Sequence, residues 1–286
     1  MHVSDPQSNQ LLHRPLKLAF FDIDGTLLGL DGNYTARVAN AIARVQALGI
    51  KTAVASGRPK FAADFLIREL GLSAAGCFCT GAHLEDPKTG QLIARHSLSP
   101  ELVSRLICAA SDRGVYTELC FGDEFFVDHR PEVSRLHSQH LRSTPKQVDC
   151  LRKQVDHGPV IKMLFAVTRE EEHRQLHQLE RDFPEAVFAY AKMAAKPEWL
   201  FVSVISDQGC KRRGFQQLLD FHQVESEQTI AFGDAQSDKI FLELAGVGVA
   251  MGNAADDVKA VANLRTLPVW DDGVAIVLER YAEIHS

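Results

Sequence analysis

Short apolar runs alternate with segments of helical periodicity at both ends of this 286-residue chain. Each run is long enough for one buried strand, and the helical segments carry their apolar residues on one face. The predicted strands are residues 18–23, 51–56, 229–232 and 247–251. The predicted helices are residues 34–48, 59–70, 215–221 and 238–244. Strands and helices that alternate in this way favour a parallel sheet, so an α/β core is expected.

The middle of the chain has a different texture. A turn signal from Asp86 to Gly90 predicts a hairpin, and a charged helix is expected at 170–182 among several short strands. We therefore expect a Rossmann-like, doubly wound parallel sheet into which an α+β domain is inserted. The expected parts are a disordered leader at 1–16, a core at 17–82 and 191–286, and an inserted domain at 83–190.

Composition narrows the class of protein. Apolar residues make up 45% of the chain and charged residues 24%, so a sizeable core can form, and disordered and coiled-coil proteins are excluded. The chain has 31 Lys and Arg against 37 Asp and Glu, a net charge of −6, which is the reverse of the usual balance in nucleic-acid-binding proteins. The six cysteines form no Cys-x-x-Cys pair, and no apolar run is long enough to span a membrane. A cytoplasmic protein without nucleic-acid or membrane partners is expected.

The first candidate for chemistry is the sequence Asp-Ile-Asp-Gly-Thr-Leu, which follows the first predicted strand. Alternate residues of an extended segment point the same way, so Asp22 and Asp24 share a side, and Gly25 allows a sharp turn after them. Two neighbouring carboxylates repel each other unless they share a proton or bind a cation, and hard oxygen ligands favour Mg²⁺. An EF-hand is the rival motif, but this segment lacks the Glu that an EF-hand loop has at position twelve. A solvated strand end is the simpler alternative.

Three further polar clusters lie at the ends of predicted elements. Ser56 and Gly57 follow the second strand, where a hydroxyl and free backbone N–H groups can bind an anion. Lys211 opens a helix, and Asp234 and Asp238 follow the third predicted strand. Each has an ordinary structural explanation: a helix-capping serine, a solvated lysine, and acidic residues at a helix N-terminus.

Taken together, the clusters are more informative than any one of them. Each acidic or hydroxyl cluster follows a predicted parallel strand, so all of them could meet at one edge of one sheet. Their inventory is three carboxylates for a metal, one hydroxyl, one amine and several backbone donors. This set suits phosphoryl transfer, in which catalysis depends mostly on positioning and charge neutralisation.

The four motifs, in this order and with an insertion between the second and the third, resemble the haloacid dehalogenase-like phosphatase superfamily. The large insertion after the second motif makes the chain similar to the Cof-type branch, in which this insertion is the cap. The resemblance covers about residues 17–281. Its specific parts are Leu18–Leu27, Ala53–Pro59, Lys211–Asp238 and Val249–Ala254.

The resemblance implies a role for each matching residue. Asp22 would be the nucleophile that forms an aspartyl phosphate, and Asp24 would protonate the leaving group and then activate water. Asp234 would ligate Mg²⁺, with Asp238 supporting the metal site. The implied metal residues are Asp22, Asp24 (through its backbone carbonyl), Asp234 and Asp238. The implied phosphate-binding residues are Gly25, Thr26, Ser56, Gly57, Arg58, Lys211 and Asn253. For Asn253 the resemblance leaves two roles open, support of the phosphate or support of the lysine.

The chain departs from the pattern of the superfamily at three positions. Ser237 stands where Asn is usual in the fourth motif, Thr80 where Asn precedes Gly-Ala, and Arg212 where a small residue follows the lysine. These departures bear on substrate contacts and on fine metal geometry. The core catalytic set is intact.

The expected cap carries a basic stretch at residues 129–162, with seven Lys and Arg against three Asp and Glu. A solvated surface explains it, and so does a basic wall that attracts a substrate with several anionic groups. His173 and His177 lie one helical turn apart, but no third metal ligand accompanies them, so a solvated helix face is expected.

The leading prediction is a Mg²⁺-dependent phosphatase of small phosphorylated metabolites, sugar phosphates first. Pyridoxal phosphate, flavin mononucleotide and nucleotides stay open as substrates. A phosphomutase is a neighbouring alternative, and a binding protein that has lost catalysis is a third. P-loop kinases are excluded, since the chain has no GxxxxGK[ST] motif.

Overall fold

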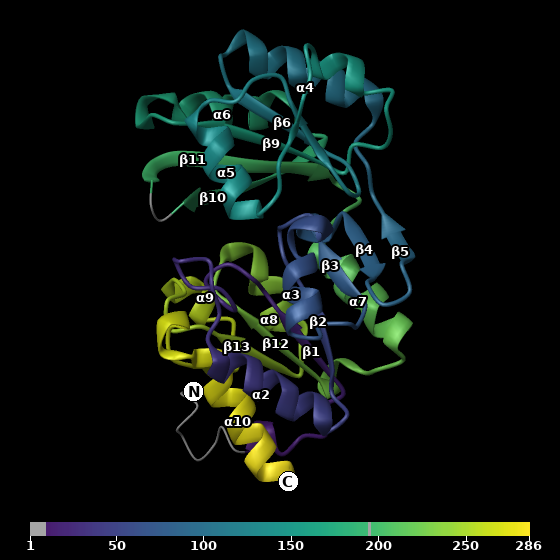
Figure 1. The fold of residues 1–286 in the computed structure, drawn as a ribbon, viewed down its shortest axis with the longest axis vertical. Helices are drawn as coiled ribbons and strands as arrows, with labels where there is room; N and C mark the ends of the chain where they lie inside the picture. The colour runs from purple at the N-terminus through teal and green to yellow at the C-terminus, as the bar shows by residue number, and fades with distance from the viewer. Residues whose placement is uncertain (1–9, 194–195) are drawn as a thin grey trace. The chain divides into compact units, whose positions relative to one another are not determined.

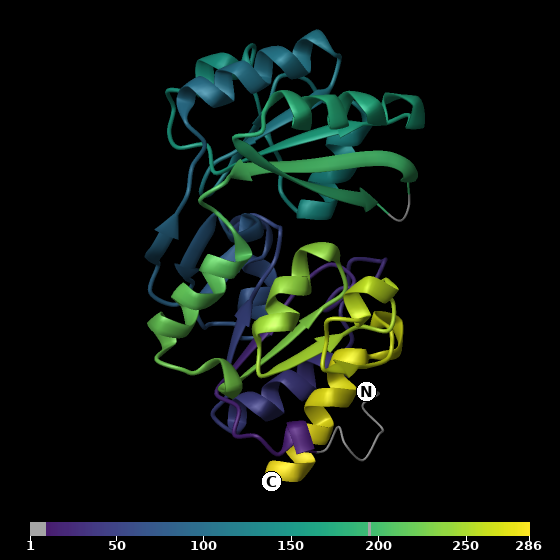
Figure 2. The same ribbon diagram turned by 180° about the vertical axis from the view of Figure 1, so that it is seen from behind.

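The computed structural model of the chain describes residues 10–193 and 196–286, which form two compact units (Figures 1 and 2). The core unit comprises the described residues up to Gly57 together with Ala63–Ile93 and Lys211–Ser286. The cap unit comprises Arg58–Ala62 and Ala94–Cys210. Among the described residues, no helix is both long and apolar enough to cross a membrane.

The core unit is built on a five-stranded sheet in the order β14-β13-β12-β1-β2, in which every pairing is parallel. Its strands are β1 (Leu18–Phe21), β2 (Lys51–Val54), β12 (Thr229–Gly233), β13 (Val247–Ala250) and β14 (Leu264–Arg265). The unit also holds a small sheet of β3 (Gly76–Phe78), β4 (His83–Asp86) and β5 (Gln91–Arg95), which begins in the core unit and ends in the cap unit.

Helices cover both faces of the five-stranded sheet. On one face, residues of α2, α3 and α10 share a hydrophobic core with Ala19 and Phe21 of β1. On the other face, the ring of Phe20 lies 5.7 Å from Phe215 of α7 and 5.1 Å from Phe241 of α8. The helices of the unit are α2 (Ala36–Ala47), α3 (Asp64–Glu69), α7 (Lys211–His222), α8 (Lys239–Leu244), α9 (Asp256–Lys259) and α10 (Gly273–His285). The predicted doubly wound α/β core is confirmed.

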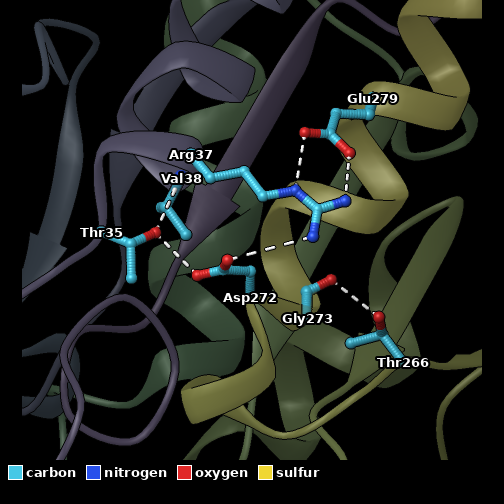
Figure 3. Close-up of polar contacts among 7 residues, drawn as sticks. All are labelled: Thr35, Arg37, Val38, Thr266, Asp272, Gly273 and Glu279. Carbon is cyan, nitrogen blue, oxygen red and sulfur yellow. Dashed lines mark hydrogen bonds and ion pairs between the residues drawn. The ribbon is translucent and has the colours of Figure 1, made fainter.

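The start of α2 is fixed by a polar network with α10 (Figure 3). The hydroxyl of Thr35 accepts a hydrogen bond from the backbone N–H of Val38 and donates one to Asp272, at 3.2 and 2.7 Å. Arg37 forms a bidentate pair with Glu279 of α10, and its guanidinium lies 3.9 Å from Asp272. The network joins the beginning of α2 to the loop that precedes α10, because Asp272 is the residue before Gly273.

The cap unit contains one mixed sheet in the order β10-β11-β9-β6-β7-β8. Its strands are β6 (Tyr116–Cys120), β7 (Phe125–Val127), β8 (Lys146–Gln147), β9 (Lys162–Val167), β10 (Ala186–Met193) and β11 (Lys196–Ser206). Helices α4 (Pro100–Asp112) and α6 (His173–Asp182) pack on one face of the sheet, and α5 (Glu132–Leu141) packs on the other. The predicted α+β architecture of the insertion is confirmed.

Two segments lie differently from the expected division. The strand β4 pairs with β3 of the core unit, although residues 83–93 were expected in the inserted domain. The strand β11 pairs with β9, which places residues 196–206 in the cap sheet. The division into 17–82 with 191–286 and 83–190 stays a prediction.

The N-terminal leader is also different from expectation over its described part. Leu12 and Leu16 are buried in the core beside α10, and the backbone N–H of Leu16 donates to the hydroxyl of Tyr281 at 3.0 Å. The expected disorder of residues 10–16 is therefore wrong, because their two leucines complete the core. Residues 1–9 of the predicted leader lie outside the described residues.

Candidate active site

The two acidic motifs, which contain Asp22 and Asp234, lie at the carboxyl ends of neighbouring strands. The backbone N–H of Asp22, directly after β1, donates to the carbonyl of Phe232 in β12 at 3.0 Å. Because β1 and β12 are parallel and in register, Asp234 leaves its strand at the same edge of the sheet as Asp22. Ser56 follows β2, which pairs with the other side of β1. The structure thus places the polar clusters at one sheet edge.

Three carboxylates form one compact group. Asp22, Asp234 and Asp238 each offer an oxygen, and the three oxygens lie within 4.8 Å of one another. Among the described residues this is the one such group of His, Cys, Asp and Glu side chains, so the pair of His173 and His177 forms no metal cluster. The side chain of Asp24 is not a member either, and its backbone carbonyl as a metal ligand stays a prediction.

The ammonium group of Lys211 lies among these acids. It donates to Asp238 Oδ1 at 2.7 Å and to the backbone carbonyl of Ala55 at 3.3 Å, and the residue is 4% exposed. Burial lowers the pKa of Lys211, but the charges of Asp238 and Asp22 outweigh it and raise the pKa overall. A permanent cation therefore sits beside the proposed nucleophile.

Asp238 holds both Lys211 and the turn after β12. Its Oδ2 accepts hydrogen bonds from the backbone N–H groups of Asp234 and Ala235, at 3.1 and 2.9 Å. Its Oδ1 accepts from Lys211 and, at 3.3 Å, from the hydroxyl of Ser237. Ser237, which stands where Asn is usual in the superfamily, thus supports Asp238. These contacts make Asp238 the link between the lysine and the turn that carries Asp234.

The electrostatics of the group favour a bound cation. Burial, with repulsion from Asp238 and Asp234, holds the pKa of Asp22 well above its usual range, although Lys211 acts in the opposite direction. Burial and the charge of Asp238 raise the pKa of Asp234 to about 7. A divalent cation would remove this repulsion, and an all-oxygen donor set is the kind that Mg²⁺ prefers. The residues present therefore fit the metal that the family implies.

A pH-dependent stability follows from the raised pKa of Asp234. Between about pH 4 and pH 7 the folded protein holds a proton that the unfolded chain has lost, so without metal the free energy of unfolding should fall as pH rises through this window. Mg²⁺ binds the ionised carboxylates, so it should raise the melting temperature more at pH 8 than at pH 5. Thermal melts in EDTA and in Mg²⁺ measure both effects. Asp234→Asn should flatten the slope, and a pH-independent metal effect would contradict the explanation.

Gly25 makes room for Asp234. Its φ is +81°, and a Cβ placed on it would lie 2.3 Å from Asp234 Oδ2. Gly25→Ala should therefore strain the backbone and also displace the carboxylate, so we expect a loss of at least ~10-fold in Mn²⁺ affinity. Gly32→Ala is the matched control, because Gly32 has φ +72° but open space around its Cβ position. It should lose about 1 kcal/mol of stability and keep its metal affinity; equal metal affinity in both variants would refute the clash.

Thr26 and Asn253 contact Asp234. The hydroxyl of Thr26 donates to Asp234 Oδ1 at 3.3 Å. The amide of Asn253 donates to Asp234 Oδ2 at 3.0 Å and to the carbonyl of Gly25 at 2.9 Å. Both residues were assigned to the substrate phosphate, and the structure brings both onto a carboxylate of the metal group.

The turn after β2 contains Ser56 and Gly57. The backbone N–H of Ser56 donates to the carbonyl of Cys77 at 2.9 Å, and its carbonyl accepts from the N–H of Thr80 at 3.2 Å. Arg58 belongs to the cap unit, where its guanidinium lies 3.4 Å from the carbonyl of Ala62 and 3.5 Å from His140 Nε2. The structure therefore groups Arg58 with residues of the cap unit, whereas Ser56 and Gly57 stay with the core unit.

Thr80 adopts a conformation that its side chain disfavours. Its φ is +59°, and Cys79 before it has φ +49°, in the left-handed region that Asn and Gly tolerate best. The strained residue lies next to the turn after β2. Its N–H donates to the carbonyl of Ser56, and its hydroxyl would lie 3.4 Å from a Cβ placed on Gly57. In the sequence, Thr80 stands out only as a departure from the usual Asn.

Thr80→Asn should consequently raise the free energy of unfolding by about 1 kcal/mol, because Asn adopts positive φ more readily than a β-branched residue. Thr80→Val keeps the β-branch and should leave the stability within about 0.5 kcal/mol. Urea unfolding of both variants measures the difference. A Thr80→Asn protein less stable than the parent would show that the hydroxyl contributes more than the strain removes.

The basic stretch of the cap is partly neutralised within its own unit. Lys146 and His157 both pair with Glu124, and His137 Nδ1 lies 2.8 Å from Glu118 Oε2. Glu118 is fully buried and also accepts from Tyr116 at 2.8 Å. This buried group could not be predicted, because a lone Glu in a strand gives no sign of its partners on α5 and β6.

The comparisons with known proteins establish the family. The model of the haloacid dehalogenase-like hydrolases matches residues 19–278, so the chain belongs to this family. With its inserted cap it is a phosphatase-type hydrolase of the Cof-type branch, as its resemblance to the superfamily predicted.

Relatives and solved structures agree over nearly the whole chain. The chain is 28% identical over 267 residues to the 5-amino-6-(5-phospho-D-ribitylamino)uracil phosphatase YitU of Bacillus subtilis, covering 92% of this chain and 97% of the relative. It is 26% identical to phosphatase YwpJ of the same organism, over 92% and 99% of the two chains. A haloacid dehalogenase-like hydrolase from Bacteroides thetaiotaomicron has the same fold, with a TM-score of 0.83, 24% identity and coverage of 93% and 99%. A subclass IIB sugar phosphatase matches with a TM-score of 0.78, 23% identity and coverage of 92% and 98%.

Proposed function

We propose that the protein is a Mg²⁺-dependent phosphatase that hydrolyses small phosphorylated metabolites, sugar phosphates first, through an aspartyl phosphate on Asp22. The observation that carries the proposal is the meeting of Asp22, Asp234, Asp238 and Lys211 in one group at the carboxyl edge of the core sheet, with Asp234 half-buried and the other three buried. Such a group combines a nucleophile, metal ligands and a fixed cation.

The chemistry has two steps. A carboxylate oxygen of Asp22 attacks phosphorus as the bond to the leaving oxygen breaks, and Asp24 gives that oxygen a proton. Asp24 then takes a proton from water, whose oxygen attacks the phosphoryl group and releases Asp22 and inorganic phosphate. Lys211 holds negative charge on the phosphoryl oxygens, and Ser56 binds one of them through its hydroxyl. A bound Mg²⁺ would supply further neutralisation of this charge.

The preference for sugar phosphates draws on two relatives. One is named as a phosphatase of a phosphoribitylamino compound and another as a sugar phosphatase, so each acts on a phosphate carried by a polyhydroxylated or sugar group. Pyridoxal phosphate, flavin mononucleotide and nucleotides are the competing substrates, and a phosphomutase would return the phosphoryl group to the sugar instead of to water.

The test measures release of inorganic phosphate from an aryl phosphate in Mg²⁺ and in EDTA, then from a panel of sugar phosphates, pyridoxal phosphate, flavin mononucleotide and nucleotides. Metal-dependent release, with the highest kcat/KM on a sugar phosphate, supports the proposal. Activity that persists in EDTA overturns the mechanism. Isomerised sugar phosphate without released phosphate identifies a mutase, and binding of phosphorylated metabolites without turnover identifies a binding protein.

A further inference from the structure

We propose that Asn253 is a positioning residue that acts through Asp234: it orients the carboxylate for the metal and makes no contact with the substrate phosphoryl group. The inference rests on the proposed function, because Asp234 is there a metal ligand. It differs from both roles that the family resemblance implied for Asn253, which were support of the phosphate and support of the lysine.

Both N–H groups of the Asn253 side chain are used within the protein. An amide nitrogen carries two N–H groups, and Nδ2 of Asn253 donates to Asp234 Oδ2 at 3.0 Å and to the carbonyl of Gly25 at 2.9 Å. Its Oδ1 accepts from the backbone N–H of Val269 at 2.9 Å. This contact fixes the orientation, since a flipped amide would place NH₂ against N–H and oxygen against a carboxylate and a carbonyl. No N–H of the side chain remains for a phosphoryl oxygen.

Both oxygens of Asp234 are held by neighbours. Asn253 bonds Oδ2, and the buried hydroxyl of Thr26 donates to Oδ1 at 3.3 Å. Two donors on opposite oxygens fix the plane of a carboxylate and leave its remaining lone pairs for a cation. Loss of a partner of this kind typically costs about 10- to 100-fold in metal affinity.

Asn253 is itself held in place from two sides. It lies in the turn after β13, where the backbone N–H of Met251 donates to the carbonyl of Gly233 at 3.0 Å. The N–H of Gly252 donates to the carbonyl of Leu267 at 3.1 Å, and a Cβ on Gly252 would lie 2.5 Å from the nitrogen of Pro268. This turn therefore packs tightly against residues 267–269, which lead into the Asp272 network of Figure 3.

The bond to Gly25 gives Asn253 a second task. Gly25 lies in the turn that carries Asp22 and Asp24, whereas Asp234 lies in the turn after β12. One amide thus joins the two turns that supply the carboxylates. Loss of the amide frees Asp234 to rotate and also releases the turn after β1, so the metal site should lose affinity while the turn after β2 is unaffected.

The test measures Mn²⁺ binding by electron paramagnetic resonance in the full-length protein, separately from activity. For Asn253→Ala we expect the Kd of Mn²⁺ to rise 10- to 100-fold. Thr26→Val removes the other donor to Asp234 with little change in volume, and it should raise the Kd about tenfold. The inhibition constant of inorganic phosphate, measured at saturating Mn²⁺, should stay within twofold of the parent for Asn253→Ala.

Asn263→Ala is the matched control. Asn263 Oδ1 accepts from the backbone N–H of Gly248 at 2.7 Å, so its loss also removes an amide contact from the core unit. It should lower the melting temperature and leave the Kd of Mn²⁺ unchanged. A Kd for Asn253→Ala no higher than that of Asn263→Ala would overturn the proposal. A weaker phosphate inhibition with unchanged Mn²⁺ affinity would also overturn it, in favour of a phosphate contact.

Failure of the proposed function would look different. Asp234→Asn should abolish detectable Mn²⁺ binding if Asp234 is a ligand. If Asp234→Asn binds Mn²⁺ as the parent does, the metal site itself is misplaced. If it does not, and Asn253→Ala is normal, the metal site stands and only the role of Asn253 is refuted.

Discussion

Asp22→Asn is expected to lower phosphatase activity by at least about a thousandfold while leaving the protein folded. An amide oxygen is a far poorer nucleophile than a carboxylate, and loss of a covalent nucleophile removes the first step of the reaction. The substitution is nearly isosteric. It also removes a buried charge whose pKa is raised by burial and by Asp238, so without metal the variant should melt no lower than the parent at pH 8.

The combination of lost activity and unchanged or higher stability is what identifies a nucleophile here. Hydrolysis of an aryl phosphate in saturating Mg²⁺ gives kcat, and calorimetry in EDTA gives the melting temperature. Asp31→Asn is the control, since Asp31 is an exposed carboxylate in the loop after the same strand and bonds only locally, to Asn33. It should keep full activity. An Asp22→Asn protein with activity within tenfold of the parent would exclude the aspartyl phosphate.

Lys211→Met should have the largest effect on stability. Lys211 and Asp238 form a buried ion pair at 2.7 Å, and each side chain is 3% exposed. Removal of one partner of a buried pair typically costs about 3–5 kcal/mol, because the other charge stays buried without compensation. We expect a fall of roughly 10 °C in melting temperature at pH 8. Phosphatase activity should fall at least ~100-fold, since the proposed mechanism needs this cation to hold charge on the phosphoryl oxygens.

A double-variant cycle separates the pair from its surroundings. Asp238→Asn alone leaves the ammonium among Asp22 and Asp234, and the double variant Lys211→Met with Asp238→Asn leaves neither charge. The double variant should lose less stability than the two single variants together, by more than 1 kcal/mol, because each single change leaves the other charge buried and unpaired. Urea unfolding of all four proteins measures this coupling. Additive losses would show that the two residues act independently.

The sequence was sufficient for the architecture and for most of the acidic group. Asp22, Asp234 and Ser56 come together because each follows a parallel strand, and strand ends can be located from apolar runs. The contacts of Thr26 and Asn253 could not be predicted, because they join residues that are far apart in the sequence. Thr26 and Asp234 are 208 residues apart, and Asn253 and Gly25 are 228 residues apart. The placement of Arg58 in the cap unit could not be predicted either, since nothing in Ser-Gly-Arg-Pro shows that the arginine belongs to a different unit from the serine.

The order of strands in the core sheet has a consequence for biosynthesis. The first strand, β1, takes its place between β2 and β12, and β12 begins at Thr229. A ribosome that adds 5–20 residues per second needs roughly 10–40 s to make the chain between them. Throughout this interval one edge of β1 has no strand to pair with, whereas β2 can pair with the other edge once Val54 has been added. The nascent N-terminal half thus carries an apolar, unpaired sheet edge that is open to aggregation until the second half of the core emerges.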